Sequence, residues 1–422
     1  MEKVIIDGGV PLKGSVPISG MKNAAVAVLF ASVLVGDVCV IENLPDISDV
    51  DISLEILKSV GVKVERITDC NAVRLDTSCA RDVMPPSELA KKMRASYYLI
   101  GASLGRFGHS AIAYPGGCDF GVRPIDQHIK AFNSLGADVT QKDNIIEASA
   151  RGERLKGSSI LFDCATVGGT MNAIMAAVLA EGSTVIENAA REPHIIDLAN
   201  FLNICGANIS GVGTDTIKIK GVDKLHKGTY ELSPDMIEAG TYMIAAAATG
   251  GEITVENVIP KHLETVSFKL REMGVDVDED ELESRVTVRG GARMCGTDVQ
   301  TRPYPGFPTD MNPQMAVLLC MADGKSSLTD TVWDNRFRYV EELKRMGACV
   351  TVEGNTAYFD GGTVFHPARV RAVDLRAGAA MIVAALSAKG QTEIEDFFYV
   401  ERGYENVIEK LRSVGANIIK IN

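Results

Sequence analysis

The segment LEILKSVGVKV, residues 54–64, decides the fold because its pattern recurs along the chain. It reads as the end of a helix, a glycine and the start of a strand. The pattern occurs six times, as LEILKSVGVKV, IKAFNSLGADV, ANFLNICGANI, FKLREMGVDV, VEELKRMGACV and IEKLRSVGANI. Its marker glycines, spaced by 68 to 75 residues, are Gly61, Gly136, Gly206, Gly274, Gly347 and Gly415. Because such a glycine ends a helix in the left-handed conformation before a strand leaves, the spacing predicts six α/β repeats.

A second helix is expected upstream of most marker glycines. Segments such as NAAVAVLFASVLVGDVCVIENL and GAAMIVAALSAKGQTEIEDF are rich in alanine and apolar on nearly every side. These helices are expected to be buried, whereas the helices that end at the marker glycines alternate apolar and charged positions and are expected to face solvent. Each repeat therefore reads as a βαβαββ-like unit.

Two similar segments mark the expected domain boundaries. PLKGSVPISGMKNA begins at residue 11, LHKGTYELSPDMIEA begins at residue 225, and each leads into an expected buried helix. A chain of 422 residues is too long for one ordinary core. If the chain crosses between domains at both segments, one α/β domain comprises residues 23–233 and the other combines 1–22 with 234–422. Each domain then holds three repeats.

The composition narrows the class of protein. Hydrophobic residues make up 46% of the chain and charged residues 23%, which is typical of a soluble globular protein. The formal net charge of −12, the single tryptophan and 6% aromatic residues argue against a nucleic-acid partner. An anionic ligand would need local arginines to attract it.

Other function classes have no support in the sequence. The nine cysteines include no CxxC pair, and the chain contains no GxGxxG, no GxxxxGK[ST] and no cluster of metal ligands. The N-terminal residues lack the apolar core of a signal peptide, and the longest apolar run, 24–35, is shorter than the ~20 residues that span a membrane. We therefore expect a cytoplasmic protein without a metal, a membrane or a nucleic-acid partner.

The glycine-rich loop YPGGCDFGVRPID, residues 114–126, places a thiol in an unusual setting. Cys118 is either a small hydrophobic residue in a turn or an accessible thiol whose pKa is lowered by Arg123. In the second interpretation it serves as a nucleophile or a general acid. His109 and His128 are the nearest histidines in sequence, so a Cys–His protease pair is not supported.

Polar residues open several of the expected buried helices. Lys22 and Asn23 begin an apolar helix, where they are either solvated or part of an anion site at the helix N-terminus. Equivalent positions in other repeats carry Arg94, Asp163, Asp310 and Asp374. We interpret Asp163 and Asp374 as helix N-caps or ion-pair partners. Asp310, in the Gly/Pro-rich segment YPGFPTD, is the better functional candidate.

Two more arginines stand near helix starts, Arg336 in WDNRFRYVEE and Arg402 in VERGYENV. Each of these arginines is either a surface charge or part of a binding site. Taken together, a lysine, several arginines, a thiol and an aspartate at equivalent ends of repeats predict a cleft for a strongly anionic substrate, with one acid and one base.

At this point a family resemblance covers essentially the whole chain. The sequence resembles the enolpyruvyl transferase family, specifically its UDP-N-acetylglucosamine 1-carboxyvinyltransferases. The motifs that carry the resemblance are, in order, SGMKNAA, MRAS, PGGCDFGVRPID, TVGGTMN, FPTDMNPQ, NRFRYVEELKRMGA, DLRAGAA and RGYE. It implies a two-domain inside-out α/β barrel of six repeated units, three per domain, with a cleft between the domains.

The resemblance also implies a reaction and its participants. The enolpyruvyl group of phosphoenolpyruvate (PEP) moves to the 3′-hydroxyl of UDP-N-acetylglucosamine (UDP-GlcNAc), and phosphate leaves, by addition and elimination through a tetrahedral intermediate. The reaction needs no cofactor and no metal, and it is the first committed step of peptidoglycan precursor synthesis. Both partners are small molecules, and the expected state is a monomer or weak homo-oligomer.

Site residues carry over only where this sequence matches the family motifs. Cys118 matches the general acid toward C3 of PEP, which can also form a covalent adduct, and Asp310 matches the base toward the sugar hydroxyl; Lys22 and Arg402 complete the catalytic set. The residues expected to bind PEP are Lys22, Asn23, Arg123, Arg336, Arg376 and Arg402. Those expected to bind UDP-GlcNAc are Asn23, Arg94, Arg123, Pro124, Ile125, Asp126, Gln127, Thr166, Val167, Gly168, Asp310 and Val332.

One departure from the family pattern keeps alternatives open. In DCATVGG, Cys164 stands where many members have lysine, which either weakens nucleotide affinity, moves the contact to another cation or marks a paralogue. A non-catalytic nucleotide-sugar-binding paralogue is therefore one alternative. The sister family of 3-phosphoshikimate 1-carboxyvinyltransferases shares the fold but lacks the cysteine loop. A repeat-built interaction protein would have no reason to gather charges at the helix starts.

Overall fold

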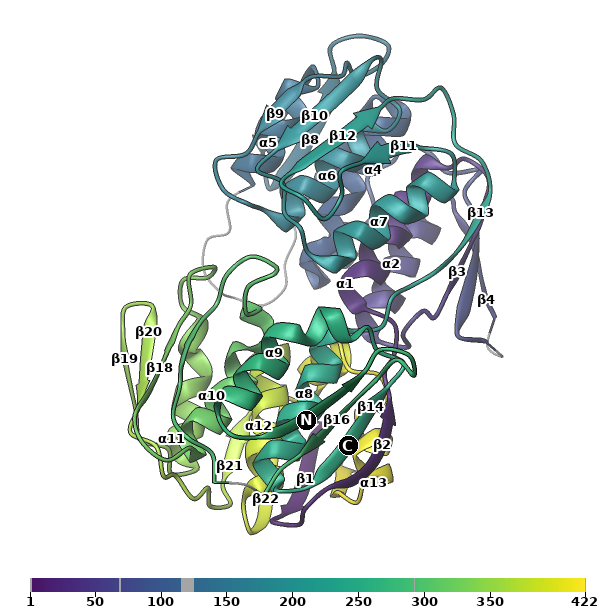
Figure 1. Ribbon diagram of the computed structural model, residues 1–422. Helices are drawn as coiled ribbons and strands as arrows, with labels where there is room; N and C mark the ends of the chain where they lie inside the picture. The colour runs from purple at the N-terminus through teal and green to yellow at the C-terminus, as the bar shows by residue number, and fades with distance from the viewer. Residues whose placement is uncertain (1, 68–69, 115–124, 292, 422) are drawn as a thin grey trace. The chain divides into compact units, whose positions relative to one another are not determined.

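The computed structural model describes residues 2–67, 70–114, 125–291 and 293–421. The chain forms two compact units. Unit 1 consists of Met1–Ser19 and Pro234–Asn422, and unit 2 consists of Gly20–Ser233. Each unit places three helices at its centre and three sheets around them (Figure 1).

Unit 2 is built around three buried, packed helices. These are α1 (Lys22–Ala31), α4 (Tyr98–Phe107) and α6 (Val167–Ala177). One sheet has the order β13-β3-β5-β4, with β13 (Gly228–Glu231), β3 (Val38–Glu42), β5 (Ala72–Asp76) and β4 (Lys63–Ile67). The second is β6-β8-β7, with β6 (His109–Ala113), β8 (Ile145–Ala150) and β7 (Ala137–Lys142). The third is β11-β12-β10-β9, with β11 (Asn208–Ser210), β12 (Thr216–Lys220), β10 (Ser183–Glu187) and β9 (Ser159–Leu161).

Unit 1 repeats this plan around α8 (Met236–Thr249), α10 (Asn312–Met321) and α12 (Leu375–Ser387), which contact one another (Figure 1). One sheet is β15-β16-β14-β2, with β15 (Asp276–Asp280), β16 (Arg285–Arg289), β14 (Glu252–Glu256) and β2 (Lys13–Pro17). Another is β17-β18-β20-β19, with β17 (Asp298–Gln300), β18 (Ser326–Thr329), β20 (Thr356–Phe359) and β19 (Val350–Glu353).

The remaining sheet of unit 1 joins the two ends of the chain. Its order is β21-β22-β1-β23, with β21 (Arg369–Arg371), β22 (Gly390–Glu395), β1 (Lys3–Gly8) and β23 (Asn417–Ile421). β1 pairs antiparallel with both β22 and β23, so Ile6 faces Thr392 on one side and Ile418 on the other. The strand nearest the N-terminus is therefore an interior strand of this sheet.

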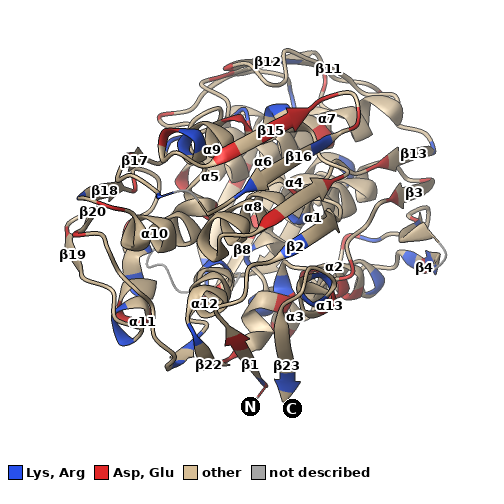
Figure 2. Cartoon of the chain, turned by 60° about the horizontal axis from the view of Figure 1, so that its bottom comes forward, with Lys and Arg blue, Asp and Glu red and all other residues tan. Residues whose placement is uncertain are grey.

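The six buried helices confirm the first helical prediction. Their alanine-rich sequences leave little side chain to separate neighbouring helices, and residues 24–31 of α1 are all buried. In Figure 2, α1, α4 and α8 are largely free of charged residues, and the acidic and basic residues lie mostly on strands, loops and outer helices. No helix in the described part of the chain is both long and apolar enough to cross a membrane.

The marker glycines behave as predicted. All six have positive φ values, between 85° and 101°. They follow the outer helices α2 (Ser48–Ser59), α5 (Asp126–Ser134), α7 (Pro193–Ile204), α9 (Pro260–Glu272), α11 (Val340–Arg345) and α13 (Val407–Ser413). The expectation that these helices face solvent is wrong for α7, most of whose residues are buried because it packs on α1 and on β13.

Candidate functional site

In unit 1, Asp310 lies between two arginines from distant segments. It sits in a 3-10 turn, η4 (Thr309–Met311), directly before α10. Arg376, near the start of α12, donates from Nε and Nη2 to Asp310 Oδ2 at 3.1 and 3.0 Å. Arg336, at the start of η5 (Arg336–Tyr339), donates from Nη2 to Asp310 Oδ1 at 3.4 Å. The structure thus brings together three of the residues predicted from sequence.

This cluster is strongly asymmetric in burial. Arg336 and Arg376 are 2% and 4% exposed, whereas the Asp310 side chain is 31% exposed. Burial alone would lower the pKa of the Arg376 guanidinium, but the charge of Asp310 raises it above its ordinary value. The Arg376 guanidinium is therefore charged at neutral pH, and the carboxylate is the part of the cluster that solvent reaches.

Local hydrogen bonds explain why these side chains meet. Asp374 caps α12 by accepting from the backbone N–H groups of Arg376 and Ala377, at 2.8 and 2.9 Å, which confirms its interpretation as an N-cap. Asp330, 1% exposed, accepts from Thr309 Oγ1 at 2.7 Å and from Asn312 Nδ2 at 3.0 Å, on either side of Asp310.

The other two predicted residues of unit 1 are Val332 and Arg402, which come from different segments. Val332 is 37% exposed, and its backbone N–H donates to Asp330 Oδ1 at 2.9 Å. It therefore shares a carboxylate partner with the turn that holds Asp310. Arg402 is the last residue of η6 (Phe397–Arg402) and is partly buried.

In unit 2, Lys22 is held by a buried carboxylate. It is the first residue of α1, and its Nζ lies 2.9 Å from Oδ2 of Asp49 on α2. The Asp49 side chain is 4% exposed and that of Lys22 is 14% exposed. Met21, which precedes α1, makes no side-chain cap. Asn23 follows on the first turn and is partly buried.

A second cluster in unit 2 joins three predicted segments. The Arg94 guanidinium lies over the Tyr97 ring, 5.4 Å from its centroid. Tyr97 packs edge-on against His128, with ring centroids 4.7 Å apart. A Cβ added to Gly168 would lie 2.8 Å from the Tyr97 hydroxyl and 2.9 Å from His128 Nε2, so only glycine fits there. The cluster thus connects Arg94, the 126–128 turn and the start of α6.

Asn172, buried on α6, ties the cluster together. Its Oδ1 accepts from the backbone N–H of Gly101 at 2.9 Å, and its Nδ2 lies 2.9 Å from His128 Nδ1. Because Nδ2 is the donor, His128 Nδ1 accepts and the imidazole proton is on Nε2. Burial, together with the charge of Arg94, lowers the pKa of His128 to about 3. His128 is therefore a neutral, fixed ring and not a proton donor at neutral pH.

Polar contacts also join the Asp126–Gln127 pair to the segment before α6. Gln127 Nε2 donates to Asp126 at 2.8 Å and to Asp163 at 3.0 Å. Asp163 also forms an ion pair with Lys130 at 2.6 Å, as the ion-pair interpretation predicted, and hydrogen bonds from Lys130 and Gln127 lower its pKa. Thr166 caps α6 by accepting from the N–H of Gly169.

Three further predicted residues of unit 2 lie next to these contacts, and three others fall outside the described part of the chain. Ile125 precedes α5, Val167 and Gly168 begin α6, and Cys164 is exposed beside Asp163. Cys118, Arg123 and Pro124 lie outside the described residues.

Sequence reasoning missed several residues of both clusters. Asp49 and Asp330 hold predicted side chains, and Tyr97, His128 and Asn172 form the centre of the second cluster. Asn172 gave a signal, because an amide inside the apolar run TMNAIMAAV needs a buried partner. The others are ordinary in sequence and gain their role only from the fold.

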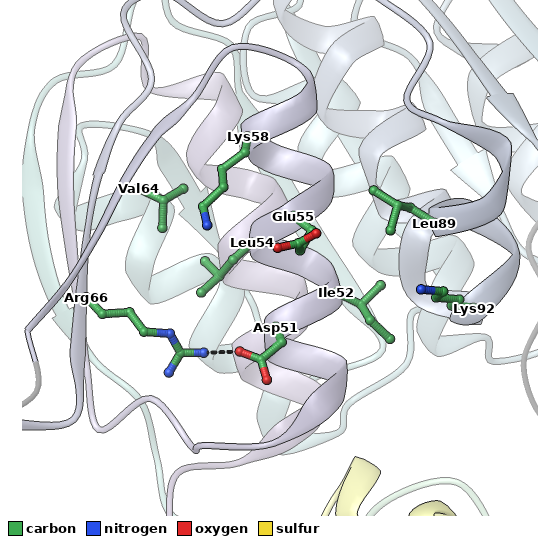
Figure 3. Close-up of a pocket in the computed structure, with 9 residues that line it drawn as sticks. All are labelled: Asp51, Ile52, Leu54, Glu55, Lys58, Val64, Arg66, Leu89 and Lys92. Atoms are coloured by element: carbon green, nitrogen blue, oxygen red, sulfur yellow. Dashed lines mark hydrogen bonds and ion pairs between the residues drawn. The ribbon is translucent and has the colours of Figure 1, made fainter.

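A pocket of about 420 Å³ lies elsewhere in unit 2 (Figure 3). It is lined by α2, β4 and the short helix α3 (Ser87–Lys92), with Lys58, Lys92 and an Asp51–Arg66 ion pair at its rim. None of the predicted site residues lines it. Within the described ranges, no three histidine, cysteine or acidic side chains gather as metal ligands.

Comparisons with known proteins place the chain in a family. Residues 6–411 match the model of the EPSP synthase (3-phosphoshikimate 1-carboxyvinyltransferase) family. The chain is 53% identical over 421 residues to UDP-N-acetylglucosamine 1-carboxyvinyltransferase 3 of Caldanaerobacter subterraneus, with all of both chains covered. It is 50% identical over 422 residues to the UDP-N-acetylglucosamine 1-carboxyvinyltransferase of Clostridium botulinum, again with full coverage of both.

Solved structures confirm the predicted fold. The enolpyruvyl transferase NikO from Streptomyces tendae superposes with a TM-score of 0.89 at 24% identity, covering 99% of this chain and 98% of that one. EPSP synthase from Acinetobacter baumannii gives a TM-score of 0.77 at 19% identity over the full length of both. At 24% and 19% identity these structures show only that the fold is shared. The full-length relatives at 53% and 50% identity show to which family within that fold the chain belongs. The chain belongs to the UDP-N-acetylglucosamine 1-carboxyvinyltransferase family, a branch of the enolpyruvyl transferases.

Proposed function

We propose that this protein transfers the enolpyruvyl group of PEP to the 3′-hydroxyl of UDP-GlcNAc and releases phosphate, as the first committed step of peptidoglycan precursor synthesis. The observation that carries the proposal is the Asp310 carboxylate, solvent-accessible and fixed between two buried arginines. The names of its full-length relatives point to the same activity.

Asp310 is the proposed base toward the sugar hydroxyl. A carboxylate in a fixed orientation can accept the hydroxyl proton as the oxygen attacks C2 of PEP. Arg376 and Arg336 hold it by charge-assisted hydrogen bonds, and their positive charge also suits the carboxylate of PEP. In this proposal Arg402 and Lys22 bind the phosphate, with the first turn of α1 and Asn23 beside Lys22.

The proton on the carbon atom comes from a second group. Cys118 donates a proton to C3 of PEP while the sugar oxygen forms its bond to C2, which gives a tetrahedral intermediate. In the second step C3 returns a proton to the Cys118 thiolate, the C2–O bond to phosphate breaks with phosphate as the leaving group, and the enol ether forms. Arg123 is assigned to the phosphate from the sequence motif.

The cluster around His128 is the proposed support of the nucleotide-sugar site. Arg94, the Asp126–Gln127 pair and the Thr166–Gly168 start of α6 are held in one rigid patch by Tyr97, His128 and Asn172. Rigid polar groups reduce the entropy lost when a flexible ligand binds. Lys130, on α5, forms an ion pair with Asp163 next to Cys164, and so places a cation beside the segment where the family lysine is missing.

The deciding experiment compares acceptors. Purified protein is incubated with PEP and either UDP-GlcNAc or shikimate 3-phosphate, and phosphate release is followed over time. Release with UDP-GlcNAc alone supports the proposal, and release with shikimate 3-phosphate alone would assign the chain to the sister activity. Tight binding of UDP-GlcNAc with no phosphate released would favour the non-catalytic paralogue. Both substrates are soluble anions, so we expect the reaction to take place in the cytoplasm. We expect the protein to act as a monomer or weak homo-oligomer.

A further inference from the structure

Tyr404 occupies the junction of the three buried helices of unit 1. It is 3% exposed and follows η6 in the RGYE segment, two residues after Arg402. The guanidinium of Arg376, on α12, lies 5.6 Å from the centre of its ring. The sequence pattern gave Tyr404 no role of its own, yet it contacts the arginine that holds Asp310.

The Tyr404 hydroxyl is fixed by the other two helices. It lies 2.8 Å from Thr241 Oγ1, on α8, and accepts from Gln314 Nε2, on α10, at 3.2 Å. Thr241 Oγ1 already donates to the backbone oxygen of Ile237 at 2.8 Å, so its single proton is used. The phenol must therefore donate to Thr241, and its own proton cannot serve in catalysis.

The electrostatics of the ring fit this structural role. Burial raises the pKa of the Tyr404 hydroxyl, and the positive charge of Arg376 opposes the rise without overcoming it. The phenol is therefore neutral at working pH, and Arg376 meets its π-system in addition to the charges of Asp310 and Asp235. A buried guanidinium gains from such a partner because nearby carboxylates offset only part of the free-energy cost of its desolvation.

We propose that Tyr404 is a positioning residue for Asp310, acting through Arg376. The phenol, fixed by Thr241 and Gln314, sets the plane of the Arg376 guanidinium, whose Nε and Nη2 in turn fix the Asp310 carboxylate. The inference rests on the proposed function, in which Asp310 is the base. It extends the site from residues that touch substrate to the core of unit 1.

The test uses two substitutions of different severity. Tyr404→Leu removes the ring and the hydroxyl, whereas Tyr404→Phe keeps the ring and removes only the hydroxyl. We expect kcat to fall about 10- to 100-fold in Y404L, because a displacement of about 1 Å at a reacting group has that effect. In Y404F the ring stays beside Arg376 and the fall is expected to be about threefold. KM for UDP-GlcNAc should change less than kcat in both.

A pH profile separates positioning from loss of stability. If Asp310 is less well held by its arginine, it takes up a proton more readily, and the acidic limb of the kcat profile moves to higher pH. Tyr242→Phe is the matched control, since Tyr242 is buried on α8 and its hydroxyl makes no hydrogen bond with the described residues. Its kcat and pH profile are expected to equal those of the wild type.

Thermal unfolding followed by circular dichroism shows which variants fold. If Y404L does not fold, the kinetic test is made with Y404F. An unchanged kcat and pH profile in a folded Y404L, or in Y404F when only that variant folds, would overturn the inference. A crystal structure of folded Y404L gives a readout that does not depend on activity. Arg376 should rotate away from Asp310 Oδ2 in that variant, and retention of both contacts would also overturn the inference. A different outcome would count against the proposed function alone. In that outcome the wild-type protein releases no phosphate, but Arg376 is still displaced in the variant.

Discussion

Arg376 donates from both Nε and Nη2 to the same oxygen of Asp310, Oδ2, at 3.1 and 3.0 Å. Arg336 donates to the other oxygen, Oδ1, at the longer distance of 3.4 Å. The paired contacts at Oδ2 fix the direction of the carboxylate, and in the proposed reaction the same carboxylate accepts the proton. A carboxylate serving as a base needs both properties at once.

Asp310→Asn tests this arrangement. The amide keeps the shape but cannot accept a proton, so phosphate release should fall at least about 100-fold. Two nearly buried arginines also lose their counter-charge, which should lower the free energy of unfolding by roughly 3 kcal/mol. Denaturant titration and steady-state assays measure the two effects. Asp138→Asn, which breaks an exposed pair with Arg151, is the control and should cost less than about 1 kcal/mol.

Substitutions of Cys118 that change the acidity of the side chain test its role as a proton donor. Cys118→Ser should abolish phosphate release and remove any PEP-derived mass increment on the protein, because a serine hydroxyl is too weak an acid at neutral pH. Cys118→Asp should retain turnover, since a carboxylic acid also delivers a proton. Mass spectrometry of the intact protein after incubation with PEP reports the adduct. Full activity in the serine variant would remove the acid role.

The close contact of α4 with α6 predicts a steric effect. A Cβ at Gly101 would lie 2.4 Å from Asn172 Oδ1, so Gly101→Ala must push Asn172 away from His128 and Tyr97. Unfolding free energy should fall by about 1–3 kcal/mol, and KM for UDP-GlcNAc should rise. Gly152→Ala is the control, because a Cβ there meets nothing within 4 Å. Equal stability of the two variants would contradict the geometry.

His109 predicts a pH-dependent contribution to stability. Its ring nitrogens lie 2.7 Å from a carboxylate oxygen of Asp82 and 3.2 Å from one of Glu147. Partial burial alone would lower the pKa of His109, but hydrogen bonds to both carboxylates raise it above its ordinary value. The raised pKa means that the charged ring stabilises the fold below about pH 6.5, the ordinary histidine value, and that this stability is lost as pH rises through the folded pKa.

The variant His109→Gln should therefore be less stable than the wild type at pH 6 and equal to it at high pH. The side chain is 36% exposed, so the difference should stay below about 1 kcal/mol. Urea titrations across the pH range measure it. In the His109→Gln background, Asp82→Asn should have no further pH-dependent effect, and a persisting one would assign the slope to another group.

The repeated architecture could be predicted because each repeat carries its own local signals. The marker glycines must adopt positive φ, and the alanine-rich helices are apolar on every side, so both features are fixed within about ten residues of sequence. α7 was mistaken for a solvent-facing helix because its burial depends on packing against α1, more than 160 residues earlier in the chain.

The residues of the candidate site also fall into a group that the sequence predicts and a group that it does not. Asp310 and Lys22 were identified because charge at the start of an apolar helix is conspicuous in sequence. The cluster of Tyr97, His128 and Asn172 is not predictable in this way, because nothing in the chain shows that residues of two different repeats meet there. Tertiary contacts between ordinary residue types leave no local pattern.

The interior place of β1 bears on how the protein is made. Unit 2 is one continuous segment and has all of its strands once residue 233 has left the ribosome. β1 is synthesised first, yet both of its neighbours, β22 and β23, come from the last 33 residues. The earliest strand must therefore wait, with both edges unpaired, for almost the whole chain to emerge. During that interval a nascent chain is most exposed to wrong strand pairing, and a chaperone would help it most there.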